Sequence, residues 1–253
     1  MIDIHSHILP GFDDGAETME ESLRMLEMAA AGGTTDIVAT PHANIEYRFE
    51  PERVEAAVSD LQACAAAPRI HPGCDFHLSY DNIRDALDNP TRYTINHRCY
   101  LLVEFSDMMI FRNSGDILRA LLEGGLVPVI THPERNSLLH DRLRDIEDWV
   151  GAGCLLQVTG HSLLGLFGER ARDFAGLLMK RGLVHVLASD AHDSVRRHPG
   201  LAEVFRHVEQ RHGMDIALRL LEANPRAILD GLPVEQAGGG AKATRRKWYR
   251  FWG

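Results

Sequence analysis

The sequence predicts an α/β fold built around parallel strands, and three observations support this prediction. About seven short apolar runs alternate with segments of helical periodicity, which is the pattern of repeated βαβ units. Ionisable residues directly follow nearly every apolar run. The length of 253 residues suits one large barrel-like domain or two small domains, and a hydrophobic content of 45% allows a substantial core.

The chain begins with a predicted buried strand that runs into a polar loop. Alternate side chains on a strand share one face, so we expect His5 and His7 to point the same way. Two neutral imidazoles placed like this can bind one metal ion, and Asp13 and Asp14 add oxygen ligands at the end of the strand. The alternative is a pair of ordinary histidines, and the motif alone does not decide between them.

The next part of the chain again has a predicted strand that is followed directly by an ionisable residue. The spacing of Thr18 and Glu21 predicts a capping box, which starts an amphipathic helix. Residues 35–40 then read as the second strand, and His42 follows it. The carboxyl ends of barrel strands carry the chemistry in α/β barrels, so His42 is a candidate site residue.

Two further strand ends carry possible ligands. A helix with Pro51 at its first position precedes a short strand, after which Asp75 and His77 stand two residues apart. Residues 99–105 read as the next strand and include Glu104 near its end. A carboxylate after five largely apolar residues is costly to bury unless it is paired, protonated or bound to metal. Glu104 is therefore a candidate ligand.

The fifth predicted strand, residues 126–131, leads into His132 and Arg135. A guanidinium group can bind phosphate or carboxylate through two parallel hydrogen bonds, so Arg135 is a candidate anion-binding residue. A sixth strand at residues 155–158 is followed by His161, which we interpret as a helix-start residue.

The seventh predicted strand, residues 184–189, opens into Asp190 and His192, which repeat the spacing of the first motif. Arg196 and Arg197 follow closely. Sites in open parallel sheets gather at one switch point, whereas here ionisable groups follow nearly every strand. This distribution favours a closed barrel with one multinuclear metal site in its mouth.

Composition restricts the environment and the partners. A net charge of −9 argues against general nucleic-acid binding. The four cysteines lack Cys-x-x-Cys spacing, which suits free thiols in a reducing cytoplasm. No apolar run reaches membrane-spanning length, and acidic Asp3 stands where a signal peptide has basic residues. We therefore expect a cytoplasmic protein.

The ordered ligand candidates resemble those of the polymerase and histidinol phosphatase (PHP) superfamily, whose fold is a distorted seven-stranded (β/α)7 barrel. The strings Val-Glu-Phe-Ser, His-Pro-Glu-Arg and Ala-Ser-Asp-Ala-His resemble the manganese-dependent protein-tyrosine phosphatases of bacterial capsule and exopolysaccharide biosynthesis. The resemblance covers about residues 1–232. The residues that carry it are His5, His7, Asp14, His42, Asp75, Glu104, His132, Asp190 and His192.

This resemblance implies a trinuclear site, expected to hold Mn²⁺, with Fe or Zn as other options. One metal ion would take His5, His7 and Asp190, and a second would take Glu104 and His132. The third would take Asp14, His42 and His192, while Asp75 would bridge the first two ions. Asp75 departs from the family pattern, because close relatives usually have the longer Glu there.

The implied activity is hydrolysis of a phosphomonoester without a covalent phosphoenzyme. Metal ions lower the pKa of bound water and neutralise phosphate oxygens. The resemblance assigns phosphate binding to Arg135 and Arg197. No cysteine stands in a Cys-x5-Arg phosphate loop, which disfavours a thiol route. The expected substrate is a phosphotyrosine protein, most specifically a membrane-associated tyrosine autokinase of polysaccharide biosynthesis.

Other functions remain open from the sequence alone. Histidinol phosphate or another small phosphate ester is a second substrate class for the same site. An amidohydrolase with a carboxylated lysine is disfavoured, because only Lys180 lies within the predicted barrel, although lysine-free deaminase-like sites stay open. A catalytically idle metal-binding regulatory module is the third alternative.

The chain divides into a predicted barrel over residues 1–232 and a linker with a basic, aromatic tail over residues 233–253. Cations and aromatic residues alternate in the tail, which is typical of segments that contact anionic membranes. A solvated chain end is the alternative. Because of this tail, the expected location includes the inner face of the membrane as well as the cytoplasm.

Overall fold

The structure is a computed structural model that describes residues 1–234. The predicted barrel domain lies within this range, whereas the predicted tail lies outside the described residues, apart from residues 233 and 234. In the described part of the chain, no helix is long and apolar enough to cross a membrane.

Strands and helices alternate through the described residues, as the sequence predicts. The strands are β1 (Ile2–Ser6), β2 (Asp36–Ala39), β3 (His42–Ala43), β4 (Arg69–Pro72), β5 (Asp75–His77), β6 (Tyr100–Glu104), β7 (Val127–Thr131), β8 (Leu155–Thr159) and β9 (Val186–Ala188). The α-helices are α1 (Met19–Ala31), α2 (Pro51–Cys64), α3 (Tyr80–Asp88), α4 (Ser114–Glu123), α5 (Leu143–Ala152), α6 (Gly160–Leu163), α7 (Glu169–Lys180), α8 (Ala202–His212), α9 (Met214–Leu218) and α10 (Asn224–Asp230). A 3₁₀ turn, η1 (Ile95–His97), and a π-helical turn, η2 (Arg219–Ala223), complete the fold.

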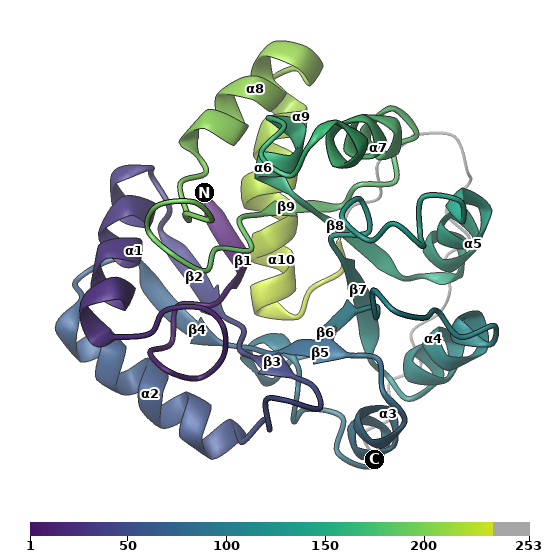
Figure 1. Cartoon of the computed structure of the whole chain (residues 1–253), viewed down its shortest axis with the longest axis horizontal. Helices are drawn as coiled ribbons and strands as arrows, with labels where there is room; N and C mark the ends of the chain where they lie inside the picture. The colour runs from purple at the N-terminus through teal and green to yellow at the C-terminus, as the bar shows by residue number, and fades with distance from the viewer. Residues whose placement is uncertain (235–253) are drawn as a thin grey trace.

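All strand pairs are parallel, which confirms the predicted α/β class. The strands form two sheets, ordered β1-β2-β4 and β3-β5-β6-β7-β8-β9, and one bridge between Ser6 and Ala191 connects them. Figure 1 shows the strands as an inner layer with helices around them. The described residues thus form nine strands in two sheets, and the pairing is not that of a single closed seven-stranded barrel.

The split between the sheets has a local cause. Pro41 separates β2 from β3, and proline has no backbone N–H to donate to a strand ladder. The predicted second strand therefore ends early, and His42 belongs to a separate short strand that pairs with Asp75 of β5. This break moves His42 to the edge of the six-stranded sheet.

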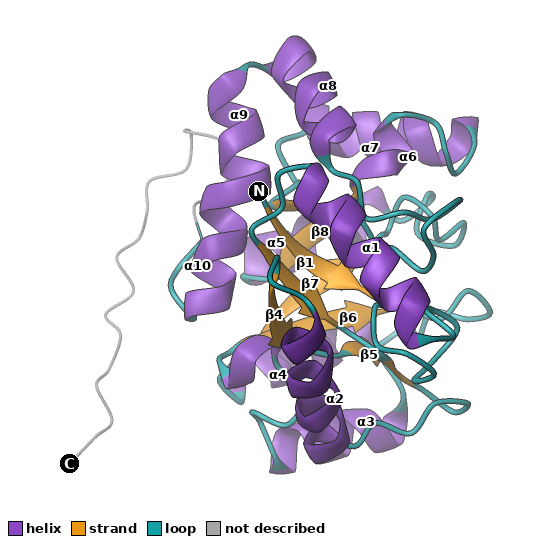
Figure 2. Ribbon diagram, turned by 90° about the vertical axis from the view of Figure 1, so that its left-hand side faces the viewer, coloured by secondary structure: helices purple, strands orange, loops and turns teal. Residues whose placement is uncertain are grey.

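Two clusters of buried apolar side chains cover the two faces of the strands. The inner cluster joins alternate strand residues such as Ile4, Leu102 and Val129 to Ile228 and Leu229 of α10. Because α10 contacts β1, it supports the inner face of the sheets. The outer cluster packs the opposite strand faces against the surrounding helices, which lie outside the strands in Figure 2.

Helix α1 begins at the predicted position, but only the Thr18 half of the predicted capping box is formed, because the Glu21 side chain bonds Arg24 and Ser194. The Thr18 hydroxyl accepts the backbone N–H of Glu21 at 3.2 Å. Met25, Leu26 and Ala29 then form the buried face of the helix. The acidic side chain of Glu21 also accepts the backbone N–H of Ser194 at 2.6 Å. Helix α1 is thereby joined to the loop that follows β9.

Candidate metal centre

His5 of β1 and His7, just after the end of this strand, lie in the centre of the fold. His5 and His7 are buried, and their Nε2 atoms lie 3.3 Å apart. The His5 Nε2 atom lies 3.5 Å from Asp75 Oδ2 and 3.4 Å from Asp190 Oδ1. His7 Nε2 lies 3.4 Å from the same oxygen of Asp190. Residues from three distant parts of the chain thus meet at one point.

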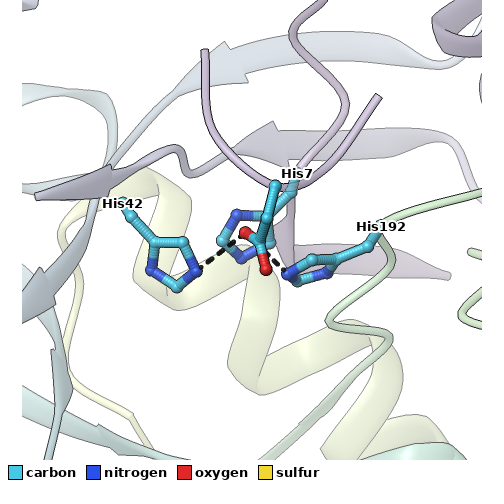
Figure 3. Close-up of side chains that lie close together, drawn as sticks. His7, His42 and His192 are labelled. Carbon is cyan, nitrogen blue, oxygen red and sulfur yellow. Dashed lines mark ion pairs between the residues drawn. The ribbon is translucent and has the colours of Figure 1, made fainter. Parts of the chain in front are cut away.

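A second cluster forms around the carboxylate of Asp14. Its Oδ1 atom lies 3.3 Å from His42 Nε2 and 3.5 Å from His192 Nε2. Figure 3 shows His7, His42 and His192 turned toward this shared position, with dashed lines for the two ion pairs. The ring centroids of His7 and His192 are 3.9 Å apart. The loop after β1 therefore contributes a ligand candidate opposite two other strand ends.

A third cluster surrounds Glu104 at the end of β6. One carboxylate oxygen, Oε2, lies 3.6 Å from His42 Nδ1 and 3.6 Å from His77 Nδ1. The other, Oε1, lies 3.7 Å from His132 Nε2. Asp75 Oδ2 lies 3.2 Å from His42 Nδ1, which connects this cluster to the first. His77, whose spacing from Asp75 is visible in the sequence, thus lies beside this cluster but is not part of the predicted ligand set.

The donor atoms fit divalent cations. Four groups of His, Asp and Glu have all their ligand atoms within 4.8 Å of one another among the described residues. Both carboxylate oxygens of Asp75 and Oδ1 of Asp190 are buried without a hydrogen-bond partner. Buried carboxylate oxygens without donors are costly, and a bound cation removes this cost. Mixed imidazole and carboxylate ligands suit Mn, Fe and Zn ions.

The buried carboxylates shift the pKa values of the neighbouring histidines. Burial alone lowers the pKa of His42, but hydrogen bonds to Asp14 and Asp75 raise it to about 11. Burial and the proximity of His7 lower the pKa of His192 to about 2. Contacts with His192 and His42 hold the pKa of Asp14 well below its ordinary value. The carboxylates around His42 thus favour positive charge at this position.

Two buried partners orient His5 and His7, and the sequence did not single them out for this role. Asp13 Oδ2 lies 2.6 Å from Nδ1 of His7, and Gln157 Oε1 lies 3.1 Å from Nδ1 of His5. Each contact leaves the Nε2 atom free to face the cluster. Such partners fix the tautomer and the ring orientation of a metal-binding imidazole. Asp13 stands next to Asp14, whereas Gln157 lies within an apolar strand and gives no signal in the sequence.

We expect the substitution Asp13→Asn to weaken metal binding without unfolding the protein. The asparagine keeps the shape of the side chain but removes the charge that stabilises the Nδ1 proton of His7. Loss of such a partner typically lowers metal affinity about 10- to 100-fold. Titration of metal-stripped protein with Mn²⁺ measures the change. Binding as tight as that of the unchanged protein, at all positions, would contradict the orienting role of Asp13.

Gly15 allows the loop after β1 to fold back onto its own strand. A Cβ atom at this position would lie 2.5 Å from the Cβ of His7. The backbone N–H of Gly15 donates to Asp13 Oδ1 at 3.0 Å, and Ala16 N–H donates to the carbonyl of His7 at 3.0 Å. This close approach places Asp13 and Asp14 beside the histidines.

The substitution Gly15→Ala is therefore expected to lower the free energy of unfolding by about 1–3 kcal/mol and to displace the Asp14 ligand. Urea unfolding and metal stoichiometry together measure the effect. Gly176→Ala in α7 is a matched control, because a Cβ atom there has no neighbour within 4 Å. Equal stability of both variants would show that the loop accommodates the methyl group.

Two of the ligand candidates have left-handed backbone conformations. The φ angles are 32° at His132 and 50° at Asp190. These values are uncommon for residues other than glycine and cluster at functional sites. They turn both side chains toward the centre at the points where β7 and β9 end.

Both predicted anion-binding arginines reach this centre. Arg135 forms an ion pair with Oδ2 of Asp190, and Nη2 of Arg197 lies 2.7 Å from the same atom. Burial and the neighbouring Arg197 lower the pKa of Arg135 to about 10, so it stays charged at neutral pH. Arg196 is exposed and stays outside the cluster. Two adjacent guanidinium groups offer a site for a dianion such as a phosphate monoester.

Two other polar residues near the site have local roles. His161 lies in α6, where its Nε2 atom contacts the carbonyl oxygen of Gly200 at 3.1 Å. Asp193 accepts the backbone N–H groups of Val195 and Arg197, which stabilises the loop that carries Arg197. The interpretation of His161 as a residue of a helix start is thus confirmed.

Parallel α/β architecture and clustered histidines and carboxylates at the carboxyl strand ends define a protein with a candidate multinuclear metal centre. The family model for capsular polysaccharide synthesis proteins CpsB/CapC matches residues 1–230. The chain belongs to this family.

Two tyrosine-protein phosphatases are similar to this chain over most of its length. The tyrosine-protein phosphatase YwqE of Bacillus subtilis (strain 168) is 33% identical over 227 residues, which are 88% of this chain and 89% of YwqE. The tyrosine-protein phosphatase CpsB of Streptococcus pneumoniae is 30% identical over 240 residues, 90% of this chain and 98% of CpsB.

A crystal structure from work on these two proteins, described as unique metal-dependent tyrosine phosphatases, matches with a TM-score of 0.87 and 31% identity. It covers 93% of this chain and 97% of the matched chain. The resemblance seen in the sequence is confirmed.

Proposed function

We propose that this chain is a metal-dependent protein-tyrosine phosphatase. The observation that carries the proposal is the meeting of the histidine–carboxylate clusters around Asp190, Asp14 and Glu104 with two arginines at one centre. Such a centre combines cation binding with recognition of a phosphate dianion. The names of the CpsB and YwqE relatives support phosphotyrosine as the substrate.

The proposed ligands follow the three clusters. His5, His7 and Asp190 would hold one ion, and Glu104 and His132 a second, with Asp75 between them. Asp14, His42 and His192 would hold a third. When bound, these ions lower the pKa of water and neutralise phosphate oxygens. We propose Mn²⁺ as the resident ion, with Fe or Zn as the options that the same ligands allow.

The arginines bind and orient the substrate in this proposal. In the absence of phosphate, Arg135 and Arg197 both contact Asp190. A phosphate dianion between them replaces this contact with hydrogen bonds to its own oxygens. Because both side chains are partly buried, fewer water molecules compete for these hydrogen bonds. Charge that develops on the phosphoryl oxygens is stabilised by the same two groups.

The cysteines support a route without a thiol nucleophile. Cys74 and Cys154 are buried, and burial raises the pKa of both thiols. A thiol with a raised pKa is a poor nucleophile at neutral pH. Cys64 is exposed in α2, away from the strand ends that carry the clusters.

The proposal includes a biological partner and a finer description of the fold. We propose that the substrate is a membrane-associated tyrosine kinase of polysaccharide biosynthesis; the family description supports the link to capsular polysaccharide synthesis. A cytoplasmic location at the inner membrane face follows from that partner. We also propose that the fold is a distorted seven-stranded barrel. The bridge between Ser6 and Ala191 and the contacts of β1 with β9 support this, because they bring the two sheets together.

The test compares two phosphate esters with the full chain. Metal-stripped protein is resupplied with Mn²⁺, and phosphate release is measured from a phosphotyrosine peptide and from histidinol phosphate. We expect release that depends on Mn²⁺ and favours the peptide. Preference for histidinol phosphate would replace the substrate class, and no release from either ester would favour a non-catalytic metal-binding module.

A further inference from the structure

A cleft of about 830 Å³ opens beside the candidate metal centre. Asp14, His42 and Glu104, three of the proposed metal ligands, line its inner end. A phosphate ester whose phosphoryl group reaches these residues therefore places its leaving group in the cleft. The shape and charge of the cleft decide which esters fit.

A tight turn over residues 44–47 forms one wall of this cleft. Oδ1 of Asn44 accepts the backbone N–H groups of Glu46 and Tyr47, both at 2.9 Å. The Tyr47 ring lies nearly parallel to the His42 ring, with 17° between the planes and 6.1 Å between the centroids. The turn thus places an aromatic side chain next to the metal centre and the fully exposed side chain of Ile45 further out.

Side-chain amides hold the other walls in place. Asn82 donates hydrogen bonds to the carbonyl oxygens of Ala43 at 2.7 Å and His77 at 3.0 Å, which joins α3 to the ends of β3 and β5. Asn136 donates to the carbonyl oxygen of Ser106 at 3.1 Å. The cleft is therefore a formed feature of the fold, as ligand-binding clefts usually are.

The outer part of the cleft has a strong negative charge. Glu46, Asp81 and Asp107 line it and are exposed, and no Lys or Arg is among its lining residues. Among the described residues, none of these three carboxylates forms an ion pair. They differ in this from Asp14 and Glu104, whose carboxylates contact imidazoles.

We propose that this cleft binds the polypeptide around the phosphotyrosine, and that Glu46, Asp81 and Asp107 select substrates with Lys or Arg beside the phosphotyrosine. The inference rests on the proposed function and specifies its substrate class. Unpaired carboxylates attract cationic side chains and repel acidic ones, which changes the rate of productive encounter. Acidic residues beside the phosphotyrosine of a substrate would lie next to these three carboxylates. Repulsion between like charges therefore weakens the binding of such segments.

The test uses two peptides with the same phosphotyrosine, one flanked by lysines and the other by glutamates. Phosphate release by the full chain with Mn²⁺ gives kcat/KM for each. We expect the lysine peptide to be favoured about tenfold or more at low salt, and the ratio to approach one at high salt because ions screen exposed charges.

The double variant Glu46→Lys/Asp107→Lys is expected to reduce this ratio at least fivefold or to invert it. Its matched control is Glu27→Lys/Asp60→Lys, which makes the same charge change on exposed positions of α1 and α2. The control is expected to keep the original ratio. The milder variant Glu46→Gln/Asp107→Asn gives the same comparison if the double lysine variant folds poorly.

Hydrolysis of p-nitrophenyl phosphate by the unchanged protein tests phosphatase activity independently of peptide selection by the cleft. If this ester is hydrolysed but the peptide ratio is near one, or is the same in the cleft variant, the inference about the cleft is wrong. If neither this ester nor either peptide releases phosphate, the proposed function is wrong, and the inference falls with it.

Discussion

Replacement of Arg135 by alanine is expected to lower kcat/KM for a phosphotyrosine peptide about 10²- to 10³-fold, since each preorganised donor to developing negative charge contributes on this scale. Arg135 lies in the centre of the site and is partly buried, and Asp190 holds its guanidinium group in place. Its carbon atom Cζ stacks 4.4 Å from the centroid of the Phe167 ring. The side chain is therefore positioned before substrate arrives.

Two further variants make this prediction specific. Arg135→Lys keeps a positive charge but loses the planar two-point contact, so we expect only a partial recovery of kcat/KM. Arg196→Ala removes an exposed cation next to Arg197 that points outside the cluster and is expected to behave like the unchanged protein. An equal loss in the Arg135 and Arg196 variants would mean that general positive charge, and not a placed guanidinium group, accounts for the rate.

Replacement of Asp75 by asparagine is expected to cause an even larger loss, with activity close to background. The carboxylate lies between His5 and His42 and is fully buried. Burial alone raises its pKa, but the neighbouring histidines hold it well below the ordinary value. The group is thus a permanent anion at the junction of two clusters, and its neutral amide offers weaker binding to a divalent cation.

Metal-free stability provides an independent measurement for Asp75. The asparagine variant removes a buried anion but also its ion pair with His42, so the metal-free variant is expected to melt within a few degrees of the unchanged protein. Addition of Mn²⁺ should then raise its melting temperature less than that of the unchanged protein. A full metal-induced rise in the asparagine variant would contradict a bridging role.

The variant Asp75→Glu provides the matched comparison, because glutamate is usual at this position in the resembling phosphatases. The charge is kept and the side chain gains one methylene group. We expect Mn²⁺ stoichiometry to be retained in this variant and lost in the asparagine variant. The comparison separates the need for charge from the need for a particular length.

The sequence predicts the parallel α/β class and the approximate strand ends, because apolar runs and polar strand ends alternate strictly. It also singles out His5, His7 and Asp190 as candidate ligands, because polar residues two positions apart at strand ends have a visible spacing. The geometry brings these residues to within 3.4 Å of one another. The assignment of each ligand to a particular metal ion stays a prediction.

Other features depend on contacts that a linear pattern does not contain. The break into two sheets arises at Pro41, where a short strand joins another sheet. Gln157 points toward His5 from a strand that otherwise reads as core. The acidic cleft joins a turn after β3 to loops after β5 and β6, so its charge becomes apparent only when these loops are placed together.

The spread of the ligands along the chain restricts when the centre can form during synthesis. His5 and His7 leave the ribosome early, whereas their respective neighbours Asp190 and His192 come from the loop after β9. Translation proceeds at about 5–20 residues per second, so the first histidines wait roughly 10–40 s for their last partners. Ribosome-stalled chains of increasing length, probed for Mn²⁺ protection, would reveal this delay. During that interval the proposed ligands of the early loop lack their later partners, so we expect the choice of metal ion to be made only after the loop that follows β9 has been synthesised.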